Sequence, residues 1–262
     1  MPSLFRQIME LGSVQLNNGP LKEAIRTFHN AKEAATNPFE IVEAAQMLCA
    51  SYRKYGNIQD SVKFGGIAYR DAVAIGGAHN LVSGTARDLA STRHALAVLS
   101  RKNRTANLYE ASRLYEIALK EAELANGTQQ RTDEYWVALG MQGLLWFDMS
   151  HYGWAPYGEG ISAYFDRLDT SEREILARDA RAMLEEADSK LRDSDKQDWK
   201  LNTLLKRIQV ETVEERLALK SRAYNYAMPF PSRRKEVPMA LAGRRFMRLA
   251  LIGEVWLRKV RR

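Results

Sequence analysis

Apolar side chains recur along most of this 262-residue chain at the three- and four-residue steps that are typical of amphipathic α-helices. One apolar stripe runs from residue 4 to 18, and a second runs from Leu21 to Ala31. Between them lies the segment Asn17-Asn18-Gly19-Pro20, which combines residues that end one helix with a residue that starts the next. The pattern therefore predicts two short helices folded against each other.

Small and large residues stand in these stripes where a tight helix pair needs them. Gly12 and Ala24 are small enough for two antiparallel helices to approach closely, and Phe28 is large enough to fill the space beside them. The segment Thr36-Asn37-Pro38 then ends the second helix. We therefore expect Gly12, Ala24 and Phe28 to meet at the contact between the two helices.

The spacing of this first pair resembles the tetratricopeptide (TPR) repeat. The matching positions are Leu11-Gly12, Gly19, Ala24, Phe28 and Ala31. Gln15 and Thr36 depart from the family pattern, which prefers an aromatic residue and a proline at those positions. The resemblance implies an all-α fold, a right-handed TPR-like superhelix of about five antiparallel helix pairs.

Similar pairs follow along the chain. In the second pair the corresponding residues come 37 positions later, and Cys49 takes the place of Gly12. We expect Cys49 to be a packed thiol, because nothing near it in the sequence would lower its pKa. A looser third pair is expected from residue 81 to the helix end at Asn126-Gly127. The fourth opens at Thr132 and is interrupted by an aromatic, glycine-rich insertion at 151–158 before a helix at about 170–191.

The fifth pair is atypical. The pattern predicts one long charged helix over residues 199–227, a break at Pro229-Phe230-Pro231, and a last helix over 238–261 with a wide apolar face and a basic stripe. We therefore expect residues 1–228 to form the repeat domain. Residues 229–262 would form a basic C-terminal capping helix packed on the same solenoid.

The basic charge of the chain is concentrated at its C-terminus. Residues 229–262 hold ten Lys or Arg and two Glu, a net charge of +8 against +7 for the whole chain, so the first 228 residues carry −1. This segment is therefore where an electrostatic partner such as RNA or an anionic membrane would bind. The residues available for contact with phosphate or lipid are Arg244, Arg245, Arg248, Arg258 and Lys259. The alternative is that the helix only caps the solenoid, or docks on a second copy in a homo-oligomer.

Cysteine usage and hydropathy indicate a cytoplasmic protein. Cys49 is the only cysteine, which excludes an internal disulfide framework and a cysteine-based zinc site and fits a reducing compartment. The chain opens directly into its first helix without the basic and apolar regions of a signal peptide. No apolar run approaches the roughly 20 residues of a membrane span.

The sequence offers little support for catalysis. Its four histidines are scattered, without the paired spacing of metal ligands, and we find no phosphate-binding glycine loop or nucleophile motif. Asp148 and His151 are three residues apart on one helix and could form a hydrogen bond, but a histidine at a helix end near the dipole is the simpler interpretation. We therefore expect no enzyme activity, no cofactor and no metal.

The TPR resemblance also implies a binding surface. In that family the first helix of each pair lines a concave face that binds peptides. The partner-binding residues implied here are Arg53, Lys54, His94, Arg101, Lys102 and Met141. The leading hypothesis is a non-enzymatic scaffold or adaptor for a peptide or partner protein of acidic, partly apolar character. Met9 and Ser13 stand where the family's clamp for chaperone C-termini has Lys and Asn, so that activity is not supported.

The insertion at 151–158 suggests a second alternative. Trp146-Phe147-Asp148, Tyr152-Gly153 and Pro156 resemble a short signature of the SusD/RagB glycan-binding proteins, whose fold also contains TPR units. The resemblance implies glycan contacts at Trp154 and Tyr157. The alternative, which we favour, is that these two aromatic residues cap the apolar core at a widened turn.

Overall fold

The computed structural model describes residues 3–100, 102–125, 131–154, 156, 167–230 and 233–244. Within these ranges the chain forms helices and one isolated β-bridge between Trp154 and Arg167. The all-α prediction is therefore confirmed. The helices are α1 (Leu4–Asn18), α2 (Leu21–Ala34), α3 (Pro38–Tyr55), α4 (Ile58–Ile75), α5 (His79–Leu99), α6 (Arg104–Leu124), α7 (Asp133–Tyr152), α8 (Thr170–Lys190), the short 3-10 helix η1 (Leu191–Asp193), α9 (Gln197–Val210), α10 (Val213–Ala227) and α11 (Glu236–Leu241).

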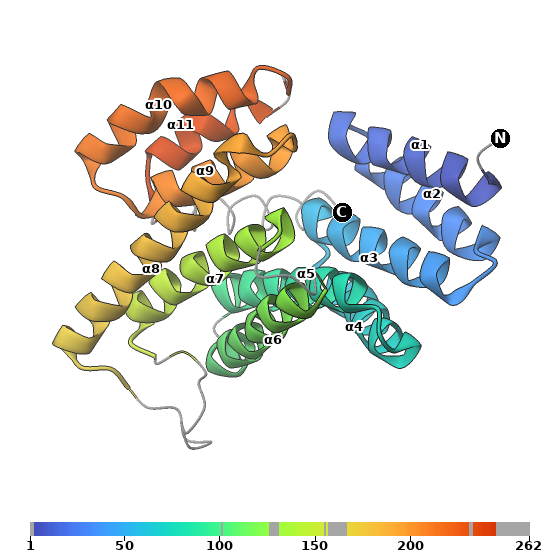
Figure 1. Ribbon diagram of the computed structural model, residues 1–262, viewed down its shortest axis with the longest axis horizontal. Coiled ribbons are helices and arrows are strands. Elements are labelled where there is room, and N and C mark those ends of the chain that lie inside the picture. The colour runs from blue at the N-terminus through green and yellow to red at the C-terminus, as the bar shows by residue number, and fades with distance from the viewer. Residues whose placement is uncertain are drawn as a thin grey trace.

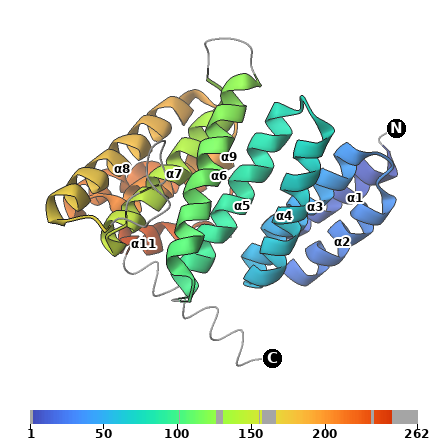
Figure 2. The same ribbon diagram turned by 90° about the horizontal axis from the view of Figure 1, so that it is seen from below.

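The helices form a curved row of neighbouring pairs. Each odd-numbered helix from α1 to α9 packs against the even-numbered helix that follows it, and Figure 2 shows the pairs side by side. The row bends into an arch with α1 near one end and α10 and α11 at the other (Figure 1). Because α3, α5, α7 and α9 contact one another in succession, they bring residues distant in the sequence to one inner face.

Local signals explain where several helices begin and end. The side chain of Asn37 accepts a hydrogen bond from the Glu40 backbone N–H and so caps α3, which has Pro38 in its first turn. Gly56 ends the same helix in the left-handed conformation, with φ of 87°. At α8, Asp169 and Glu172 form a reciprocal capping box.

The expected tight contacts are present at the N-terminal end. A Cβ on Gly12 would lie 2.6 Å from a ring carbon of Phe28, and Ala24 and Phe28 are fully buried. In the second pair, a Cβ on Gly65 would lie 2.9 Å from Cys49 Sγ, so Cys49 fills the space that an aromatic residue occupies in the first pair. The predicted meeting of Gly12, Ala24 and Phe28 is confirmed.

One predicted element is wrong. The expected single helix over 199–227 is two helices, α9 and α10, which fold back on each other. The break occurs because the Thr212 hydroxyl accepts from the Glu215 N–H while the Glu215 carboxylate accepts from the Thr212 N–H, a capping box that starts α10. This Thr-x-x-Glu signal was present in the sequence.

The expected helix over 238–261 corresponds to the described residues only in part. α11 spans Glu236–Leu241, and Gly243 follows it with φ of 88°. Buried Val237 and Ala240 belong to one apolar cluster with Leu201 and Leu204 of α9. Residues 245–262 lie outside the described residues. Among the helices that are described, none is both long and apolar enough to cross a membrane.

Candidate binding cavity on the inner face

A cavity of about 340 Å³ lies on the inner face of the arch. Its walls come from α3, α5, α6, α7 and α9, together with Arg244. Three of the residues predicted for the concave face, Arg53, His94 and Met141, line this one cavity although they come from three different helices. We refer to it as the inner cavity.

The inner cavity has two chemically different sides. Its cationic wall consists of Arg53 from α3, Lys206 from α9, and Arg244. Its apolar wall consists of Ala95 and Val98 from α5, with Met141 and Leu144 from α7. A ligand with both an anionic and an aliphatic part would match these two walls.

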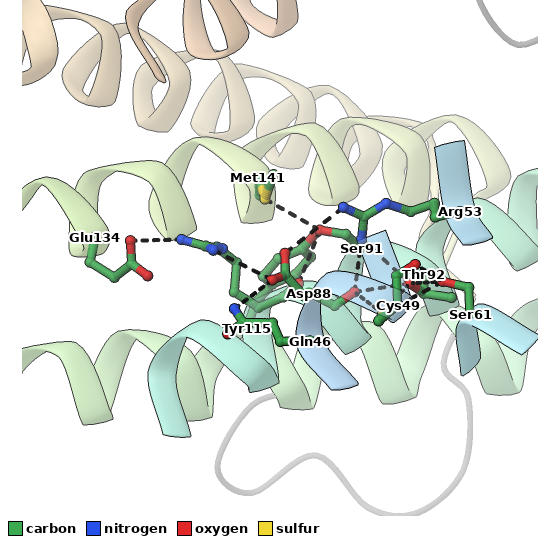
Figure 3. Close-up of polar contacts among 11 residues, drawn as sticks. Gln46, Cys49, Arg53, Ser61, Asp88, Ser91, Thr92, Tyr115, Glu134 and Met141 are labelled. Carbon is green, nitrogen blue, oxygen red and sulfur yellow. Dashed lines mark hydrogen bonds and ion pairs between the residues drawn. The ribbon is translucent and has the colours of Figure 1, made fainter. Parts of the chain in front are cut away.

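Arg53 is held in place by the backbone and side chain of Asp88 (Figure 3). Its Nη1 donates to the Asp88 carbonyl oxygen over 2.9 Å, and its Nη2 lies 3.8 Å from the Asp88 carboxylate. The Asp88 carboxylate also accepts from Gln46 Nε2 over 2.7 Å and lies 3.6 Å from Arg87, which pairs with Glu134 at 2.7 Å. The Arg53 guanidinium is therefore oriented before any ligand binds.

The polar groups beneath the apolar wall are neutral. Ser91 Oγ lies 3.0 Å from the Tyr115 hydroxyl oxygen and 3.3 Å from Met141 Sδ (Figure 3). Burial raises the pKa of Tyr115 to about 12, so its phenol keeps its proton at neutral pH. These contacts fix the position of Met141 on the apolar wall.

Cys49 is a buried structural residue next to this network. Its Sγ lies 3.4 Å from Thr92 Oγ1 and 3.5 Å from Ser61 Oγ (Figure 3). Burial raises the pKa of the thiol, which therefore stays protonated and unreactive. The prediction of a packed thiol is confirmed.

Asp148 of α7 holds Arg244, one of the residues of the cationic wall. It is fully buried on α7, lies 2.8 Å from His94 Nε2, and accepts from Arg244 Nε over 3.1 Å. Burial alone would raise the pKa of Asp148, but the Arg244 guanidinium and the His94 contact outweigh it and hold this pKa well below its ordinary value. Arg244 also donates to Gln209 Oε1 over 2.9 Å. Sequence reasoning compared Asp148 only with His151 and missed these two partners, because they lie far away along the chain.

Lys206 is the second residue that sequence reasoning missed. Its Nζ donates to the Asn202 carbonyl oxygen of its own helix over 3.3 Å, and in the described part of the chain no carboxylate lies within ion-pair distance of it. Burial lowers the pKa of Lys206 to about 7, and Arg233, Arg53 and Arg244 contribute to the decrease. A predicted helix boundary at Thr212 would have made α9 the first helix of a pair. Because first helices are expected to line the inner face, Lys206 would then have been a candidate residue.

The other residues predicted for partner binding lie elsewhere. Lys54 donates to the Leu16 carbonyl oxygen over 2.7 Å, at the contact between α3 and α1. Lys102 is exposed in the turn before α6 and does not line the cavity. Arg101 lies outside the described residues, as do Arg245, Arg248, Arg258 and Lys259.

The residues named for the two alternative functions have structural partners where they are described. Arg244 is bound to Asp148, which leaves its guanidinium little freedom to bind phosphate or lipid. Trp154 packs against the apolar core, and the Arg167 guanidinium lies 5.2 Å from its ring centre. Tyr157 is outside the described residues. In the ranges that the structure covers, no group of three or more His, Cys, Asp or Glu could hold a metal ion.

Comparisons with known proteins bear on the fold. No protein-family model matches the chain, and no curated protein matches it. Among solved structures, a crystal structure of BtubC (BKLC) from P. vanneervenii matches with a TM-score of 0.51 and 16% sequence identity, covering 92% of this chain and 82% of that chain. At this identity the similarity supports the helical fold and carries no functional information.

Proposed function

We propose that this chain is a non-enzymatic scaffold that binds an acidic, partly apolar segment of a partner protein on its inner face. The observation that carries the proposal is the inner cavity, where Arg53, His94 and Met141 come together from three helices. A pocket with a cationic wall and an apolar wall suits a peptide with an acidic group beside an aliphatic one.

We further infer that the arch is a right-handed TPR-like superhelix. Two features support this inference: the close contact of Gly12 with Phe28 in the first pair, and the succession of α3, α5, α7 and α9 along the inner face. In a solenoid of this kind the inner face gathers side chains from several repeats into one binding surface. The single buried thiol of Cys49 fits a reducing compartment, and we propose a cytoplasmic location.

Three of the groups at the inner cavity are held in a way that suits recognition of a ligand. Asp148 is held as a carboxylate by Arg244 and His94, Tyr115 keeps its proton, and Arg53 is tied to Asp88. Groups fixed in one protonation state and one orientation are suited to complementary contacts, and Lys206, whose pKa is about 7, is the exception among these cavity groups. A peptide partner is therefore the simplest occupant.

The experiment that tests the proposal is a selection from displayed random peptides of about twelve residues on the full-length protein. The key variant is Ala95→Trp, which fills the inner cavity from α5 without changing its charge. The matched control is Ala218→Trp, at an exposed position of α10. Circular dichroism would establish that both variants keep their helices.

We expect the selection to enrich peptides that contain Asp or Glu next to aliphatic residues. Their binding should be lost in Ala95→Trp and kept in Ala218→Trp. If no peptides are enriched, or if the enriched peptides bind Ala95→Trp as well as they bind the wild type, the inner cavity is not the binding surface and the proposal is wrong.

A further inference from the structure

Among the described residues that line the inner cavity, Arg53 and Arg244 each lie within ion-pair distance of a carboxylate, and Lys206 does not. Arg53 and Arg87 face Asp88 and Glu134, Arg244 faces Asp148, and Arg233 pairs with Glu236 at 2.7 Å. Lys206 faces Arg53 from α3, Arg233 and Glu236 from the segment around α11, and Arg244. Within the described residues it has no carboxylate within ion-pair distance, so the lining of the cavity carries one uncompensated positive charge when Lys206 is protonated.

On this basis, and given the proposed function, we propose that the anchor of the bound peptide is a single carboxylate that pairs with Lys206, next to an aliphatic side chain that lies on the apolar wall. The aliphatic group would contact Val98, Met141 and Leu144, which line the same cavity. Lys206 is then the specificity-determining residue of the site. The Arg53 guanidinium, which Asp88 already orients, can donate a hydrogen bond to the same carboxylate.

A carboxylate fits this arrangement better than a phosphate. A carboxylate brings one negative charge and compensates one excess cation, whereas a phosphate monoester brings nearly two at neutral pH. Arg53 and Arg244 are already engaged by Asp88 and Asp148, so a second negative charge would have to compete with those ion pairs or remain uncompensated. The apolar wall offers no hydrogen-bonding partner to an uncompensated charge, which increases the cost of burying one there.

The test uses three capped dipeptides that differ only in the anionic group: acetyl-Glu-Leu-amide, acetyl-Gln-Leu-amide and acetyl-phosphoSer-Leu-amide. Each is titrated into full-length protein labelled with ¹³C at the lysine ε-carbons and the methionine methyl groups. Lys206 then reports on the cationic wall and Met141 on the apolar wall. The variants are Lys206→Met, the conservative Lys206→Arg, and the control Lys220→Met, which removes the same charge from an exposed position of α10.

We expect the Glu peptide to shift both signals, to raise the pKa of Lys206, and to bind about tenfold more tightly than the Gln peptide, because it gains a charge-assisted hydrogen bond. Lys206→Met should abolish this tenfold difference, Lys206→Arg should largely restore it, and Lys220→Met should leave it unchanged. A merely structural role for Lys206 would not make its pKa respond to the ligand.

Three results would overturn the inference: equal affinity for the Glu and Gln peptides, tighter binding of the phosphoserine peptide, or a Glu preference that survives Lys206→Met. None of these three results would by itself contradict the proposed scaffold function. If displayed peptides bind in a manner that Ala95→Trp blocks, but the Glu and Gln peptides bind equally, then the scaffold proposal stands and the carboxylate assignment fails.

Discussion

The two ends of the arch both have apolar cores, but only one of them adds buried ion pairs between its described helices. In α1 to α4 the helices meet through small and large apolar residues, as where Gly12 receives the ring of Phe28. In α7 to α10 two fully or almost fully buried carboxylates organise the packing, Asp148 on α7 and Asp188 on α8. The first contact is apolar and joins neighbouring helices, whereas the Asp148 contacts are ionic and join residues 54 and 96 positions apart.

Asp188 shows how the ionic contacts join helices. Its carboxylate pairs with Arg207 of α9 at 2.8 Å and with Arg222 of α10. Arg207 in turn reaches Glu185 of α8 and Glu211 at the start of the turn into α10. Three helices therefore share one charged cluster.

The comparison explains why the inner cavity has two unlike walls. Asp148 of α7 pairs with Arg244, and Arg244 also donates to Gln209 of α9, which places this cation at the cavity. The apolar wall comes from α5 and α7, where close helix packing leaves aliphatic side chains at the inner face. A buried ion pair is a weak source of net stability but is very costly to break, so this end of the arch should be the more sensitive to a single change of charge.

The largest effect is expected from Asp148→Asn. This isosteric change leaves Arg244 and His94 without their carboxylate in a fully buried position. We expect the free energy of unfolding to fall by about 3–5 kcal/mol, as when one partner of a buried pair is removed. Urea unfolding followed by circular dichroism measures the change.

The matched control for this change is Asp71→Asn. Asp71 pairs with Arg70 at the surface of α4, where an ion pair contributes at most about 1 kcal/mol. A loss of less than about 1 kcal/mol in Asp148→Asn, similar to that of the control, would show that the buried carboxylate does not hold this end together.

The next largest effect is expected from Gly12→Val at the apolar end. The new side chain would collide with the Phe28 ring, since even a Cβ would lie 2.6 Å from it. We expect a loss of about 2–3 kcal/mol from overpacking, measured by the same urea unfolding. Gly66→Val in α4 is the control, because nothing lies within 4 Å of a Cβ at that glycine.

A second substitution tests whether contact with the Phe28 ring causes the loss of stability in Gly12→Val. In Gly12→Val combined with Phe28→Leu, the smaller side chain gives room to the valine, so the two changes should cost less together than the sum of their separate effects. Strictly additive losses would mean that Gly12 is needed for a reason other than its contact with Phe28.

The same contrast explains how much of the molecule could be predicted from its sequence. Gly12, Ala24 and Phe28 lie within two neighbouring helices, so their spacing alone indicated the contact and the all-α fold. His94 and Arg244 are 54 and 96 residues from Asp148, and no local pattern pairs groups at such distances. Arg53, His94 and Met141 were expected on one concave face from the repeat register, which relates distant helices, and they line one cavity.

Lys206 was missed for a different reason. The pattern of apolar residues continues across Thr212, so periodicity alone joined α9 and α10 into one helix. The capping box of Thr212 and Glu215 is a competing local signal, and in the folded chain it determines the boundary. Recognising this capping box would have changed the predicted pairing of the last helices and the face on which Lys206 was expected.

The smallest effect, with the opposite sign, is expected from Lys206→Met. The folded chain places this ammonium group among Arg53, Arg233 and Arg244, and a thioether of similar length avoids the cost of burying the charge. Because the side chain remains partly accessible to water, we expect a gain of about 1–2 kcal/mol at neutral pH. The same variant should lose the Glu preference of the cavity, so stability and binding would change in opposite directions.

The pH dependence of this gain identifies its origin. The pKa of Lys206 is about 7 in the folded chain and near 10.4 in an unfolded one. The unfolded chain therefore binds more protons between these values, and the wild type gains stability relative to Lys206→Met as the pH rises through that window. The advantage of the variant should be complete below about pH 7, shrink as the pH approaches 10, and disappear above the unfolded pKa. Urea unfolding of both proteins at a series of pH values measures it. An advantage that stays constant across the window would mean that methionine packs better than lysine. The burial of the ammonium charge would then not be the cause of the difference in stability.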